Sequence, residues 1–102
     1  MIFVDASVSC ASPFEFYRIL PARDDSYTTH AMSPQTVLSV YEQANKQSSP
    51  VAYMLTVRGT QFELGQPLST SAKHNMKMAI AFLTDIIQRP RDNWLPPNNK
   101  VF

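Results

Sequence analysis

Apolar residues along the chain fall into short patterned segments separated by polar stretches. Continuous or alternating apolar patterns at residues 2–4, 14–20 and 51–57 are typical of β-strands. Two further segments repeat apolar residues at helical spacing, and each follows a serine that can cap a helix: residues 34–46 after Ser33, and a longer segment ending near residue 88 after Ser69 or Ser71. The predicted order of strand, strand, helix, strand, helix indicates an α/β fold.

We expect three layers, in which a small, mostly parallel sheet is flanked by helices, in one domain that covers residues 1–89. The first strand is predicted to be buried on both faces because its apolar run is continuous, and Asp5 follows directly after it. The helices are expected to turn an apolar stripe towards the sheet, formed by Val37, Val40, Tyr41 and Ala44 in the shorter one and by Met76, Ala79, Ile80, Leu83, Ile86 and Ile87 in the longer one. Residues 90–102 are polar and rich in proline and asparagine, which predicts a mobile tail.

The composition fits one folded domain without the signature of a nucleic-acid-binding or membrane protein. The 102 residues are 44% hydrophobic and 17% charged, with a formal net charge of +1. Lysines and arginines are scattered, so they form no basic patch for nucleic acid. No stretch approaches the roughly 20 apolar residues of a membrane span. Cys10 is the only cysteine, so no disulfide can form within the chain, and we expect a cytoplasmic protein.

Asp5 and His30 are the side chains best suited to metal chemistry. A carboxylate at the carboxyl end of a strand can bind a metal or act as a general base, but it can also cap the following turn, and position alone slightly favours the cap. Neutral imidazole is the commonest metal ligand, although an exposed histidine beside the helix start is the commoner case for a residue placed like His30. Among the weaker candidates, Asp24-Asp25 fits a solvated turn, His74 fits an exposed helix position, and Cys10 lacks a basic neighbour that would activate its thiol.

Three further segments follow one another along the chain: Ile2-Phe3-Val4-Asp5-Ala6, Thr28-Thr29-His30-Ala31-Met32-Ser33, and Phe62-Glu63-Leu64-Gly65 with Leu68-Ser69. Together they resemble the nickel-iron hydrogenase maturation endopeptidases over roughly residues 1–88. The first resembles the family's apolar strand ending in Asp-Ala, the second its Thr/Ser-x-His segment before a helix, and the third its turn before a long C-terminal helix.

The resemblance implies a protease that recognises nickel in the hydrogenase large-subunit precursor and removes the C-terminal extension of that precursor. It implies that Asp5 and His30 both contact the metal and that Asp5 is also the candidate catalytic base. Nickel is then part of the substrate rather than a permanently held cofactor, and carboxylate and imidazole are suitable donors for it. We therefore expect Asp5 and His30 to converge in one cleft at the carboxyl edge of the sheet.

The family's opening strand, its Gly-x-Gly-Asn loop and its third metal-contacting acid have no counterpart in this sequence. We therefore expect a domain that is truncated at its N-terminus relative to the family, with an exposed strand edge through which the chain self-associates. One alternative function is a non-catalytic interaction or metal-binding module derived from the family. A small metal-binding protein unrelated to peptidases would need only Asp5 and His30.

Overall fold

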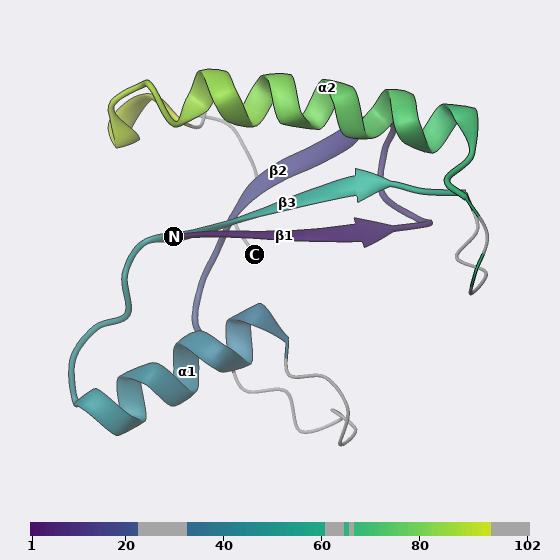
Figure 1. The fold of residues 1–102 in the computed structure, drawn as a ribbon. Coiled ribbons are helices and arrows are strands. Elements are labelled where there is room, and N and C mark those ends of the chain that lie inside the picture. Colours follow the sequence, from purple (N-terminus) through teal and green to yellow (C-terminus); the bar gives the residue numbers. More distant parts are fainter. Residues whose placement is uncertain (23–32, 61–64, 66, 95–102) are drawn as a thin grey trace.

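A three-stranded mixed sheet with two helices forms the fold of the computed structural model, which describes residues 1–22, 33–60, 65 and 67–94 (Figure 1). Strand β3 (Ala52–Arg58) lies in the middle, with β1 (Ile2–Ser7) on one side and β2 (Phe14–Ile19) on the other. β1 runs parallel to β3, whereas β2 runs antiparallel to it. The sheet is therefore mixed rather than mostly parallel. Residues 8–13 join β1 to β2, and this connection is too short for two strands that run in the same direction, which need a crossover of about a dozen residues or more. β2 therefore runs opposite to β1 and to β3.

Both helices begin where the serine signals predict. Helix α1 (Pro34–Asn45) starts after Ser33, whose hydroxyl accepts from the Thr36 N–H at 3.1 Å. Helix α2 (Thr70–Ile86) starts after Ser69, whose hydroxyl accepts from the Ala72 N–H at 3.1 Å. The two helices lie on opposite sides of the sheet (Figure 1). No helix in the described part of the chain is long and apolar enough to cross a membrane.

The face of the sheet under α2 is packed with aromatic rings. Phe82 of α2 lies with its ring centre 4.8 Å from that of Phe14 and 5.0 Å from that of Phe16. The ring of Phe16 also stacks on Tyr53 at 5.3 Å, and Trp94 contacts Tyr53 at 5.0 Å. Trp94 directly follows the short 3₁₀ helix η1 (Arg91–Asn93) and holds the start of the predicted tail against the sheet, whereas residues 95–102 lie outside the described residues.

The opposite face has a smaller apolar core near the amino end of β3. Leu38 of α1 packs there with Ile19, Ala52 and Met54, and each of the four is at most 8% exposed. Val37, Val40 and Tyr41 remain exposed, so the apolar stripe predicted for α1 is wrong at these positions. Leu38 is the helix residue that the sheet buries.

β1 is an edge strand, which corrects the prediction that it is buried on both faces. Val4 is 59% exposed, and no strand among the described residues pairs with the outer edge of β1. The same geometry leaves Met76 and Ile80 of α2 exposed, although both belong to the predicted stripe. α2 packs on β3 and β2 and buries Ala72, Asn75, Ala79 and Ile86, so the flank of the helix on the β1 side has little beneath it.

Candidate functional site

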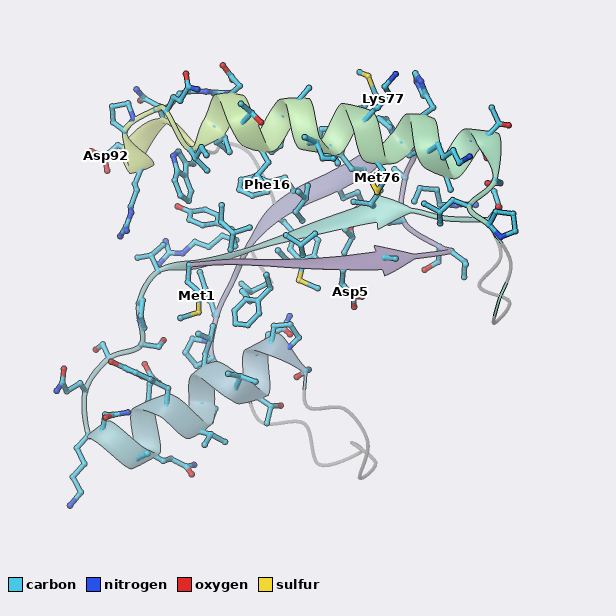
Figure 2. The ribbon with its side chains drawn as sticks, in the orientation of Figure 1. Met1, Asp5, Phe16, Met76, Lys77 and Asp92 are labelled. Carbon is cyan, nitrogen blue, oxygen red and sulfur yellow. The ribbon has the colours of Figure 1, made fainter. Side chains whose placement is uncertain are left out.

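Asp5 lies inside β1 rather than directly after it. The strand continues to Ser7 because Asp5, Ala6 and Ser7 keep their parallel register with residues 56–58 of β3. The partner of Asp5 in this register is Thr56. Side chains alternate along a strand, so Asp5 shares the face of Met54, which packs against Leu38 of α1. Figure 2 accordingly shows the Asp5 side chain on the α1 side of the sheet.

The carboxylate of Asp5 makes one hydrogen bond, which is local. Its Oδ1 accepts from the N–H of Ala6 at 2.8 Å. Met1 and Ser7 turn their carbonyls towards β3, where they accept from Tyr53 and Gly59, so the alternate residues of β1 turn their backbone groups to the outer edge. Asp5 thus accepts a hydrogen bond from the Ala6 N–H, one of the backbone groups that face the outer edge of β1. This arrangement corresponds to the local capping role considered for Asp5, and it leaves Oδ2 without a hydrogen-bond partner in the described part of the molecule.

His30 lies outside the described residues, as do Asp24 and Asp25. Its convergence with Asp5 therefore stays a prediction. Ser33 and α1 follow closely after His30 in the sequence, and α1 lies on the same side of the sheet as the Asp5 side chain (Figure 2). His74 is exposed on α2, as predicted.

Glu15 and Thr56 form a row with Asp5 that the sequence did not reveal. Thr56 of β3 pairs with Asp5 on one side and with Glu15 of β2 on the other, so the three side chains share the α1 face. Thr56 is only 8% exposed, and its Oγ1 has no hydrogen-bond partner. Glu15 Oε1 accepts from the Ala11 N–H at 2.7 Å. Buried hydroxyls nearly always have a partner, so the one on Thr56 is the unusual feature of this face.

Neighbouring negative charges act on the pKa of the Tyr17 hydroxyl. Burial raises the pKa of the Tyr17 hydroxyl, and the charges of Glu15, Cys10 and Asp5 raise it further. Tyr17 is the register partner of Met54, so its ring lies on the same face of the sheet as Asp5 and Glu15.

A second polar network ties the loops together where β1 and β3 end. The Arg58 guanidinium donates to the Cys10 carbonyl at 2.6 Å, and the Asn75 amide donates to the Arg58 carbonyl at 3.0 Å. Ser12 donates its hydroxyl proton to Asn75 Oδ1 at 3.2 Å. Cys10 is buried, and its thiol donates to the carbonyl of Thr56 at 3.7 Å. These bonds assign Cys10, Arg58 and Asn75 a structural role in holding the loop between β1 and β2.

A cleft of about 370 Å³ opens beside β1 on the α2 side of the sheet. Apolar side chains of β1 and α2 dominate its walls, which are formed by Val4, Asp5, Ala6, Val57, Arg58, Gly59, Leu68, Ala72 and Met76. The Asp5 side chain belongs to the opposite face, so this cleft is not centred on its carboxylate. The apolar cleft therefore does not correspond to the predicted cleft of Asp5 and His30, which stays a prediction because His30 lies outside the described residues.

Within residues 1–22, 33–60 and 67–94, no group of three or more histidine, cysteine, aspartate or glutamate side chains could hold a metal ion. A scan against models of protein families gave no match, and searches of curated proteins and of solved structures found no similar protein. The resemblance to hydrogenase maturation endopeptidases therefore rests on the three sequence segments.

Proposed function

We propose that this chain is a nickel-recognising endopeptidase of the hydrogenase maturation type, or a form of one, acting on the large-subunit precursor. The observation that carries the proposal is the position of Asp5. It lies in the carboxyl half of a strand that is parallel to its neighbour, on the side of the sheet where α1 begins shortly after His30. Open α/β sheets use this end of their parallel strands for ligands.

In this proposal Asp5 and His30 contact the nickel that the precursor already carries. Asp5 Oδ1 is held by the Ala6 N–H, which orients the carboxylate and leaves Oδ2 for the metal or for a water. A carboxylate in this position can accept a proton from the attacking water, while the metal polarises the carbonyl of the scissile bond. The products are the shortened large subunit and its released C-terminal peptide.

The alternative is a non-catalytic interaction or metal-binding module with the same surface. One observation favours it. The cleft beside β1 is lined mostly by apolar side chains rather than by acids. Such a cleft suits an apolar segment of a partner better than a water that must be activated.

Processing of a nickel-loaded large-subunit precursor distinguishes the two. We expect no cleavage by this chain alone. Fused to the N-terminal segment of a full-length family member, which supplies the missing acid, it should shorten the precursor, as seen by electrophoresis and intact mass. In that fusion Asp5→Asn should abolish cleavage, whereas Asp92→Asn, an equal charge change in η1, should not. A fusion that binds the precursor without cutting it would support the non-catalytic module instead.

A further inference from the structure

The outer edge of β1 carries backbone groups that no strand in the described part of the chain binds. Ile2, Val4 and Ala6 turn their N–H and C=O groups to this edge, because the residues that alternate with them bond to β3. The side chains of these three residues share the α2 face of the sheet, and all of them are apolar. The edge can therefore accept a further extended strand, which would widen the sheet.

A second copy of β1 fits this edge because the edge is complementary to itself. If two copies run antiparallel about Val4, each Val4 lies opposite the other and exchanges both of its outward backbone groups with it. Ile2 of each copy then lies opposite Ala6 of the other copy. The pairing thus sets a large apolar side chain against a small one at both ends, and all the facing side chains are apolar.

The cleft beside β1 provides the space for the larger of these side chains. Val4 and Ala6 line the cleft from β1, and Ala72 and Met76 line it from α2. Met76 points from α2 towards the sheet, yet it is 42% exposed (Figure 2). Ile2 of a second copy would lie opposite Ala6 and enter this cleft, whose volume of about 370 Å³ has room for it. Burial of apolar surface from both copies would stabilise the pair.

Asp5 is the residue that opposes this pairing. Its Oδ1 accepts from the outward N–H of Ala6 at 2.8 Å, and the C=O of Ile2 in the second copy would need the same donor. The antiparallel register also brings the two copies of Asp5 to diagonal positions on the α1 face, about 7–8 Å apart, where their charges repel. Charged side chains on edge strands limit such pairing in natural sheets. Asp5 therefore controls how tightly two copies bind.

We propose that the β1 edge and the cleft beside it form one interface for a second copy of this chain. In this interface the strands pair antiparallel about Val4, Ile2 of each copy fills the cleft of the other, and Asp5 limits the affinity. The interface does not depend on the proposed function, because it uses only the register of β1, the cleft and the hydrogen bond between Asp5 and Ala6.

Sedimentation velocity of the full chain over a range of concentrations tests the contacts. Ile2→Ala leaves both clefts unfilled and should weaken the dimer by about tenfold or more. Val40→Ala is the control, since Val40 is exposed on α1, on the other side of the sheet, and should leave the dissociation constant unchanged. Circular dichroism melting curves show whether each variant is folded.

Two substitutions of Asp5 test its opposing role in the same measurement. Asp5→Ala frees the Ala6 N–H in both copies and removes the repulsion, so it should strengthen the dimer by about tenfold or more. Asp5→Asn removes the charge but keeps an oxygen that can accept from the Ala6 N–H, so its gain should be smaller.

Cysteine cross-linking tests the register. Val4→Cys places two thiols opposite each other with their Cα atoms about 5.5 Å apart, which suits a disulfide, so mild oxidation should give a covalent dimer. Met76→Cys is the matched control, because Met76 is also an exposed residue of the cleft wall. Its helix packs on β3 and β2, so the two copies of α2 stand apart and should not cross-link. The thiol of Cys10 is buried in both variants.

The results separate the parts of this interface. Cross-linking of Val4→Cys, with a weaker dimer in Ile2→Ala and a tighter one in Asp5→Ala, would support it. Cross-linking of Val4→Cys no faster than that of Met76→Cys would overturn the register, and an Ile2→Ala dimer as tight as the wild type would overturn the role of the cleft. Wild-type and Asp5→Ala chains that both stay monomeric up to millimolar concentration would overturn the interface.

Discussion

The two faces of the sheet differ in the side chains that they carry, although both are made by the same three strands. Under α2, rings and aliphatic side chains fill the face: Phe14, Phe16 and Tyr53 pack with Phe82 and Trp94. Under α1, an apolar core at one end gives way to acids and an unpartnered hydroxyl at the other. The α2 face therefore contributes mainly apolar burial, whereas the α1 face combines apolar burial with polar side chains.

β3 contributes to both faces, and its alternation shows the division residue by residue. Leu55 points into the aromatic face, with 1% of its surface exposed, whereas Thr56 points into the polar end of the other face, with 8% exposed. These neighbours are almost equally buried, yet burial stabilises the first and penalises the second. Apolar burial contributes about 25 cal/mol per Å², whereas burying a hydroxyl without a partner costs free energy. Substitutions at the two positions should therefore change stability in opposite directions.

The largest effect is expected from Leu55→Ala. Truncating a buried leucine removes contact area and leaves a cavity, which costs about 2–5 kcal/mol of the free energy of unfolding. Urea unfolding followed by circular dichroism measures this loss. Val4→Ala is the control, because Val4 is the register partner of Leu55 but is 59% exposed, so its change should stay within about 0.5 kcal/mol. Val4 and Leu55 lie on the same face, so equal losses at both positions would mean that the burial of Leu55 does not determine the size of the effect.

The sequence predicted the elements of this sheet but not the neighbours of each strand. Serine caps at Ser33 and Ser69 and the alternation of residues 51–57 gave the helices and the middle strand closely, because these signals are local. The register was not predictable, because pairing depends on contacts between distant segments. For this reason Asp5 was assigned to the end of its strand, and the row that it forms with Thr56 and Glu15 was not predicted.

The edge position of β1 was missed for a related reason. A continuous apolar run predicts burial only if other elements cover it, and the described residues put β3 on one side of β1 and no strand on the other. Met76 and Ile80 follow the helical period of the predicted stripe, yet the sheet beneath α2 is too narrow to bury them. Periodicity thus identified the helix, while the width of the sheet decided which of its apolar residues are buried.

A smaller effect of opposite sign is expected from Thr56→Val, which removes the unpartnered hydroxyl at nearly constant volume. The free energy of unfolding should rise by about 1 kcal/mol, because the buried oxygen no longer lacks a partner. Thermal melting should show a gain of about 4–8 °C for a domain of this size. Thr84→Val is the control, since the Thr84 hydroxyl already donates to the Ile80 carbonyl at 2.8 Å and its removal should give no gain. A loss of stability in Thr56→Val would show that its hydroxyl has a partner in solution.

The smallest change in stability, with a clear change in assembly, is expected from Val4→Lys on the edge strand. We expect two copies to pair through their β1 edges in antiparallel orientation about Val4, which turns its backbone groups outward. Two lysines would then lie directly opposite each other and repel, so sedimentation velocity should show monomer at concentrations where the wild-type chain associates. The free energy of unfolding of the monomer should change by no more than about 0.5 kcal/mol, because Val4 is largely exposed.

Ile80→Lys places the same charge on exposed apolar surface of α2 and should leave association through the strand edge intact. Equal loss of association in both variants would assign it to general apolar contact, and a wild-type chain that stays monomeric throughout would refute the pairing.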